Sequence, residues 1–266
     1  MTDRPGVRHG LFVDQQHTAS GDGIEPSPVT VLMSKDDPKK EITVKITGPN
    51  LIRLAGLSAV LAGICYVGVG LLHPANLPSS ITTTRWATAH LLMCAVCFFG
   101  LLGMAGIYAR QAVRSGWFGL VGFVMLSLWL VIVMGFSFVE AFILPQAGTV
   151  TPAFVEGWMG MFNGTASTVN LGVMPTLWTL TAPLYILGGL SFGIATFRAR
   201  ILPRGAAALL AAGTAAAPVA VLLSLETQPK MAIPVGLALA WLGYALLTER
   251  RTPTLQLTER TVAATA

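Results

Sequence analysis

Long apolar segments with almost no charge dominate this chain and constrain its fold more than any other feature. Between Arg114 and Arg198 the only charged residues are Glu140 and Glu156. Over the whole sequence 53% of the residues are hydrophobic and 11% are charged. A soluble domain usually carries about 25% charged residues, and apolar runs of about 18 or more residues are typical of membrane-spanning helices. We therefore expect an all-α integral membrane protein.

Prolines, glycines and clusters of basic residues divide the apolar sequence into six segments. The pattern predicts a six-helix transmembrane domain over residues 51–247, with crossings at about 54–72, 86–108, 117–144, 171–197, 205–225 and 231–247. Pro74 and Pro145 are expected to end the first and third crossings, since proline disrupts a helix interior. Pro183 is expected to kink the fourth crossing, and Pro218 lies inside the fifth.

The segments outside the predicted crossings differ in character. Residues 1–50 are polar and too poor in apolar side chains to form a core, which predicts a disordered cytoplasmic tail. Residues 248–266 form a second polar tail. Between the third and fourth crossings, Thr151 and Pro152 are typical of a helix start, and apolar residues recur at helical spacing over 152–162. This pattern fits a helix lying in the outer interface, or equally a lid packed on the bundle's own end.

The distribution of basic residues predicts the orientation. With the N-terminus inside, 15 of the 17 Lys and Arg residues fall in inner segments, and only Arg85 and Lys230 fall outside. The positive-inside rule therefore places both termini in the cytoplasm, which agrees with an even number of crossings. The net charge of +5 follows from these clusters, so it does not indicate nucleic-acid binding.

In this topology His73, His90 and Glu140 all lie at similar depth near the outer face. Ionisable residues in membrane segments are costly and are candidates for function. Two imidazoles and a carboxylate could bind a divalent metal such as zinc or iron, and the two histidines could instead be axial ligands of a haem. Glu140 could donate or accept a proton, which makes it the candidate catalytic residue.

Each of these residues also has a simpler interpretation. A histidine at a helix C-terminus, as His73 is, is favoured by the helix dipole. Glu140 can reach the water interface, and His90 can hydrogen-bond a neighbouring helix. Trp86 and Trp158 lie near expected membrane boundaries, where an aromatic belt explains them without any function.

The three cysteines, Cys65, Cys94 and Cys97, all lie inside apolar runs, so they do not indicate an extracellular disulfide framework. His90, Cys94 and Cys97 share one helical face, which makes a Cys/His metal site an alternative. Buried cysteine more commonly serves as a small apolar residue.

Four short motifs stand between residues 72 and 145: Leu72-His73-Pro74, Trp86 with His90, the segment Gly106-Ile107-Tyr108-Ala109-Arg110-Gln111, and Glu140 followed by Pro145. Together they resemble a pattern in uncharacterised bacterial multipass membrane proteins, notably from actinobacteria. The resemblance covers the first three crossings and implies a bacterial inner-membrane setting. It implies no activity.

Three functions fit these observations. The first is a non-enzymatic accessory or binding protein with an outward-facing polar pocket near His73, His90 and Glu140. The second is a membrane enzyme or redox protein that uses this pocket for haem, a metal or acid–base chemistry. The third is a small-solute transporter. The expected partners are the lipid bilayer and either another membrane protein or a second copy of the chain.

Overall fold

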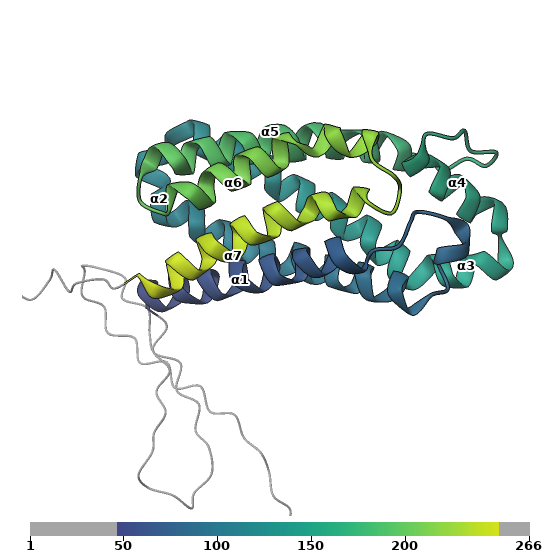
Figure 1. Cartoon of the computed structure of the whole chain (residues 1–266), viewed down its shortest axis with the longest axis horizontal. Coiled ribbons are helices and arrows are strands. Elements are labelled where there is room, and N and C mark those ends of the chain that lie inside the picture. The colour runs from purple at the N-terminus through teal and green to yellow at the C-terminus, as the bar shows by residue number, and fades with distance from the viewer. Residues whose placement is uncertain (1–46, 250–266) are drawn as a thin grey trace, which may run out of the picture. The chain divides into compact units, whose positions relative to one another are not determined.

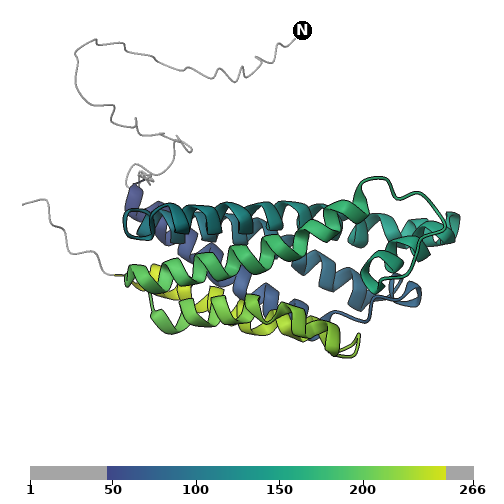
Figure 2. The same cartoon turned by 90° about the horizontal axis from the view of Figure 1, so that it is seen from above.

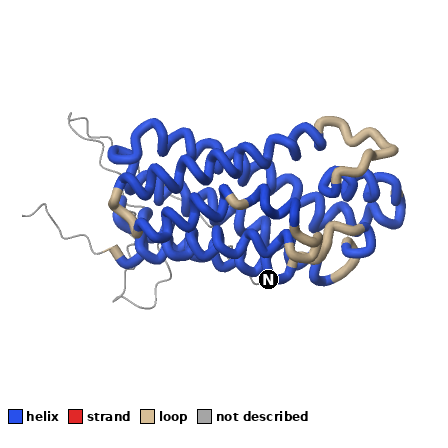
Figure 3. The backbone as a smooth tube through the Cα atoms, turned by 45° about the horizontal axis from the view of Figure 1, so that its top comes forward, coloured by secondary structure: helices blue, strands red, loops and turns tan. Residues whose placement is uncertain are grey.

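The structure, a computed structural model, describes residues 47–249. The predictions for residues 1–46 and 250–266 lie outside this range. Within it every regular element is helical (Figure 3). The α-helices are α1 (Gly48–Leu72), α2 (Thr84–Phe138), α3 (Leu144–Val150), α4 (Pro152–Asn163), α5 (Met174–Ala199), α6 (Arg204–Ala215) and α7 (Ala232–Thr248). Four helical stretches are long and apolar enough to cross a membrane, which is consistent with the expected membrane protein.

The longest element, α2, folds back on itself at Gly116. This residue has φ 56° and ψ −157°, a conformation that a residue with a Cβ rarely adopts. Trp86 Nε1 donates to the carbonyl oxygen of Glu140 at 2.8 Å, although a straight helix would separate residues so far apart by about 80 Å. The rings of Tyr108 and Phe123 stack 5.1 Å apart, closer to the turn. Residues 84–115 and 117–138 are therefore two antiparallel arms.

The end of the second arm differs from the prediction. Pro145 does not stop the helix, because a single turn of π-helix, Val139–Ile143, intervenes and α3 then begins with Pro145 in its first turn. At that position the missing N–H of proline costs no hydrogen bond. The helical chain consequently continues to Val150, beyond the predicted boundary at residue 144.

The predicted crossing at 205–225 is also shorter than expected as an α-helix. α6 ends at Ala215 and continues as a 3-10 helix, η3, over Ala217–Leu222. Pro218 has no N–H to donate to the carbonyl of Thr214, which weakens the α-helical pattern at this position. α5, by contrast, passes through Pro183 and ends at Ala199.

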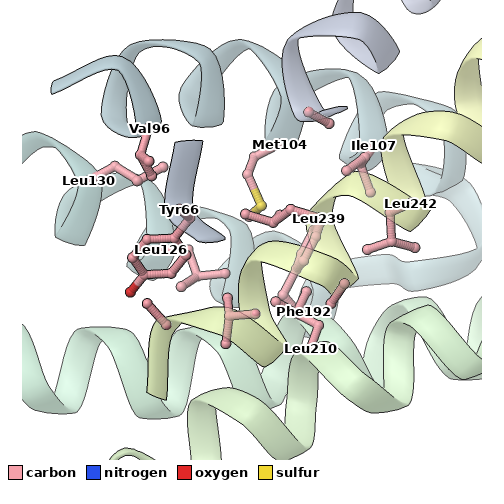
Figure 4. Close-up of a cluster of buried hydrophobic side chains, with 14 of the residues drawn as sticks. Tyr66, Val96, Met104, Ile107, Leu126, Leu130, Phe192, Leu210, Leu239 and Leu242 are labelled. Carbon is pink, nitrogen blue, oxygen red and sulfur yellow. The ribbon is translucent and has the colours of Figure 1, made fainter. Parts of the chain in front are cut away.

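Close backbone contacts between helices depend on glycine. α1 and α7 lie side by side (Figure 1), and a Cβ atom on Gly236 would lie 2.7 Å from the carbonyl oxygen of Gly63. A Cβ on Gly243 would lie 2.6 Å from the carbonyl oxygen of Gly56. Small residues allow this close approach between membrane helices. Apolar side chains from α1, α2, α5, α6 and α7 fill the space between the helices (Figure 4).

The two ends of the bundle differ in charge. The start of α1 and the end of α7 lie at one end, whereas α3 and α4 lie at the other (Figures 1 and 2). The first end carries six arginines of the described residues: Arg53, Arg110, Arg114, Arg198, Arg200 and Arg204. There the Arg110 guanidinium pairs with the carboxylate of Glu249. The α3/α4 end carries only Arg85 and Lys230 among the described basic residues.

α4 covers part of the α3/α4 end. Its buried residues Val155, Trp158 and Met159 pack in a cluster with Trp86 and Phe136. The helix thus places its apolar face on the bundle itself, as the lid interpretation of residues 152–162 requires. This packing brings an indole ring next to the candidate functional residues.

Candidate functional site

His73, His90 and Glu140 converge at the α3/α4 end of the bundle. His90 lies on the first arm of α2, and its Nε2 is 3.1 Å from Oε2 of Glu140. His73 follows the last residue of α1, and the centroid of its ring is 4.8 Å from that of His90. The three residues that the sequence singled out therefore form one cluster.

Glu140 lies on the π-turn, and this local geometry explains how its backbone takes part in the site. The Glu140 carbonyl accepts the indole N–H of Trp86, a fully buried residue in the first turns of α2. π-Turns within α-helices are frequent at functional sites because they redirect side chains and free backbone groups. Here the Glu140 side chain points toward the first arm of α2, where His90 lies.

The two carboxylate oxygens of Glu140 have different partners. Oε2 contacts His90, whereas Oε1 accepts a hydrogen bond from Nε1 of Trp158 at 3.3 Å. Both donors are buried, since Trp158 is 2% and His90 is 3% exposed. An N–H donor stabilises a carboxylate better than a neutral carboxyl group. The site thus provides a buried nitrogen partner for each carboxylate oxygen of Glu140.

Hydrogen bonding also determines where the protons of His90 lie. Its Nδ1 is 2.8 Å from the carbonyl oxygen of Trp86, and because a carbonyl can only accept, Nδ1 must carry a hydrogen. The contact between Nε2 and Glu140 Oε2 then requires one further proton, on the imidazole or on the carboxyl group. His90 and Glu140 therefore share one proton and together carry no net charge.

His73 differs from His90 in its protonation. Its Nδ1 lies 2.6 Å from the Pro74 carbonyl oxygen, so Nδ1 carries the hydrogen and Nε2 is left as an acceptor. Burial, and then the positive charge of His90, lowers the pKa of His73 from 6.5 to about 4. Its imidazole is consequently neutral at physiological pH.

A cavity of about 320 Å³ adjoins the cluster. The chain segments at the α3/α4 end supply its outer part, including Asn76, Leu225 and Gln228. Six phenylalanine, tyrosine and tryptophan rings line it: Tyr66, Trp129, Phe136, Phe162, Trp178 and Tyr185. A volume of this size is within the range of small-molecule sites, which are typically apolar with a few convergent polar groups.

Two tyrosines and a tryptophan lie at the inner part of this cavity. The Tyr66 and Tyr185 hydroxyl groups are 3.4 Å apart, and the rings of Trp129 and Tyr185 have centroids 4.6 Å apart. The same three residues also line a smaller, apolar cavity of about 30 Å³ further along the bundle. They therefore separate the larger cavity from the apolar interior.

The donor set does not fit the haem or metal interpretations. Both ring nitrogens of His90 already have partners, so neither is free to ligate iron or zinc while these contacts persist. Among residues 47–249, no three His, Cys, Asp or Glu side chains are grouped as a metal site would require. Cys97 lies in the apolar core, and the cavity lining contains none of the described cysteines.

Four residues of the candidate site were not singled out by the sequence. Trp86 and Trp158 hold Glu140, yet their positions near membrane boundaries fitted an aromatic belt equally well. Tyr66 and Tyr185 lie within long apolar runs, where isolated tyrosines carry no motif. The helical spacing of Trp158 with Val155 and Met159 was the one available signal, because it marked a face that needs a partner.

No known family model matches this chain, and comparison with curated proteins and with solved structures finds no significant match. The resemblance to actinobacterial multipass proteins therefore stays a prediction. The function is therefore inferred from the chemistry of the residues around the cavity.

Proposed function

We propose that this chain is a multipass protein of the bacterial inner membrane that binds a small ligand in a pocket open to the outer face. The observation that carries the proposal is the convergence of His73, His90 and Glu140 on the wall of one aromatic-lined cavity. Ionisable side chains are expensive in a membrane and persist where they serve a ligand or a proton.

Six crossings best account for the helices. α1, α5 and α7 each supply one, and the two arms of α2 supply two. α6 alone is about 18 Å long, shorter than the roughly 30 Å hydrocarbon core. Together with η3 it supplies the sixth crossing, because other helices of the bundle can satisfy the backbone groups that Pro218 leaves free.

The charge difference between the two ends supports the orientation. Six arginines at the end that carries the start of α1 correspond to a cytoplasmic face under the positive-inside rule. The pocket then lies on the outer side, with α4 as a lid at that surface. Both termini of the six-helix domain are cytoplasmic in this arrangement.

A second candidate is a membrane enzyme that uses acid–base chemistry. The observation that favours it is the proton shared by His90 and Glu140, since this proton lies on the cavity wall and could pass to a bound substrate. The enzyme requires ligand binding in the same pocket, so the binding proposal is tested first.

Cysteine labelling tests the orientation. In a background without Cys65, Cys94 and Cys97, Asn76→Cys should react with a membrane-impermeant maleimide added to intact cells. Val113→Cys, which is 99% exposed at the arginine-rich end, should react only after the cells are opened. The reverse pattern would refute an outward-facing pocket.

Thermal unfolding in detergent tests binding. A panel of organic cations, neutral alcohols and carboxylates is added to the wild type and to Ser137→Trp, which fills the cavity. At least one class should raise the Tm of the wild type and leave that of Ser137→Trp unchanged. Val113→Trp, at an exposed site outside the cavity, should respond like the wild type. If no class stabilises the wild type, the pocket does not bind small ligands.

A further inference from the structure

The charges of the cavity lining restrict which ligands it can accept. Glu140 is the one carboxylate among the lining residues of the described chain, and none of them is a lysine or arginine. His73 is neutral at physiological pH, as described above. An anionic ligand would therefore meet a carboxylate and no fixed positive group other than His90, whose charge Glu140 already neutralises.

The aromatic lining favours the opposite charge. Six rings surround the cavity, and the faces of Trp, Tyr and Phe rings attract cations, quaternary ammonium groups above all. This attraction strengthens where water is excluded. A small organic cation can be held by such rings while its charge lies toward Glu140.

The proton shared by His90 and Glu140 then determines whether the carboxylate can neutralise a bound cation. A single carboxylate cannot neutralise both a bound cation and a protonated His90, and two like charges close together in a poorly solvated site repel strongly. The charge of a quaternary ammonium ligand is permanent, whereas His90 loses its charge when its proton leaves. The structure thus provides one negative charge for which a ligand cation and a proton compete.

We propose that the pocket binds a small organic cation in exchange for the proton shared by His90 and Glu140. This inference rests on the proposed binding function and specifies its ligand class. When the cation enters, the N–H bond at Nε2 of His90 breaks, its electron pair stays on nitrogen, and the proton passes to water. Neutral His90 keeps its Nδ1 hydrogen bond to Trp86, and the Glu140 carboxylate neutralises the cation. The charge of the site is the same before and after.

Other ionisable groups face the pair from several elements. His73 at the end of α1 lies against His90, and Arg85 and Cys94 lie near the cluster on the first arm of α2. Tyr66 and Tyr185 line the cavity farther in and are neutral at ordinary pH. α4 presents the indole of Trp158, which does not titrate. None of these groups supplies a second exchangeable proton near pH 7.

Titration calorimetry of the full-length protein in detergent tests the exchange. The probe is choline, and its control is the uncharged alcohol in which a carbon atom replaces the quaternary nitrogen. Choline should bind more tightly, with about one proton released per cation when heats are compared in buffers of different ionisation enthalpy. Its affinity should rise with pH, because each bound cation displaces one proton.

Two variants separate the roles of the pair. Glu140→Gln should abolish choline binding, whereas Glu156→Gln, which changes an exposed carboxylate on α4, should bind like the wild type. His90→Gln retains Glu140 and should bind choline without proton release and with little pH dependence. Because proton release is measured on the wild type, a Glu140→Gln variant that fails to fold does not remove the test.

Each remaining outcome overturns the inference in a distinguishable way. If the uncharged alcohol binds as tightly as choline, the ligand is not selected by charge, although the binding pocket stands. If choline binds without releasing a proton, the exchange is wrong. If neither binds, cation exchange is refuted, whereas an outward-facing pocket that binds another ligand class is judged by the cysteine labelling and the Tm panel.

Discussion

Nε2 of His90 lies 3.1 Å from Oε2 of Glu140, and this contact joins the first arm of α2 to the π-turn that follows its second arm. The side chains are only 4% and 9% exposed, so water screens the pair little. Because Trp86 binds the backbone of Glu140 and the ring nitrogen Nδ1 of His90 binds the backbone of Trp86, the pair belongs to a closed network. The residues of the site therefore also hold the far end of the folded-back helix together.

Removing the carboxylate should destabilise the protein strongly. Glu140→Ala leaves His90 and the Trp158 indole without their acceptor, and breaking a buried pair in this way costs about 3 kcal/mol. Glu140→Gln keeps an acceptor for Trp158 and a donor for His90, so it should cost less than half as much. Unfolding by denaturant in detergent measures both. Glu156→Ala, on the exposed face of α4, is the control and should stay within about 0.5 kcal/mol of the wild type.

The indole of Trp158 should contribute to the docking of α4. Trp158→Phe retains an aromatic ring in the cluster but deletes the N–H that Glu140 Oε1 accepts. We expect a loss of about 1–2 kcal/mol and faster proteolysis within residues 146–170, since local opening of the lid becomes easier. Trp241→Phe, at a half-exposed position on α7, should change neither quantity. Equal proteolysis rates in the two variants would contradict the role of this hydrogen bond.

The contact between α1 and α7 should tolerate no added side-chain carbon. In Gly236→Ala the new Cβ would lie 2.7 Å from the Gly63 carbonyl oxygen, so the two backbones must separate. We expect a lower Tm and a loss of about 1–3 kcal/mol. Gly135→Ala is the matched control, because a Cβ there meets nothing within 4 Å and alanine favours the helix. A Tm for Gly236→Ala at or above that of Gly135→Ala would argue against the close packing.

The sequence predicted the all-helical fold, because long apolar segments with little charge are typical of helices. Apolar length and sparse charge were enough to find the long helices, and Gly116 falls between the second and third predicted crossings. The end predicted at Pro145 was wrong, and the crossing predicted across Pro218 has a 3-10 helix there instead of a continuous α-helix. Pro145 lies in the first turn of α3, Pro183 lies inside α5, and Pro218 follows the end of α6, and sequence spacing does not show which of these cases applies.

The candidate site was predictable in part. His73, His90 and Glu140 stood out because charge is rare in membrane segments, whereas only the structure shows that they lie together. The sequence could not show the π-turn at Glu140, which depends on tertiary contacts. Nor could it show that both ring nitrogens of His90 are already used, the observation that argues against haem and metal ligation.

Acid should destabilise the folded protein through His73. Its pKa is about 4 when folded and returns to 6.5 when the chain unfolds, because burial disfavours the protonated ring. Between these values the unfolded chain binds the extra proton, so stability is complete above pH 6.5 and falls as the pH drops toward 4, by at most about 1.4 kcal/mol per pH unit. Below pH 4 both states are protonated, and this residue causes no further loss. Tm measured in detergent from pH 7 to pH 4 should therefore fall more steeply for the wild type than for His73→Asn. Parallel curves for the two proteins would show that His73 is not buried as a neutral base.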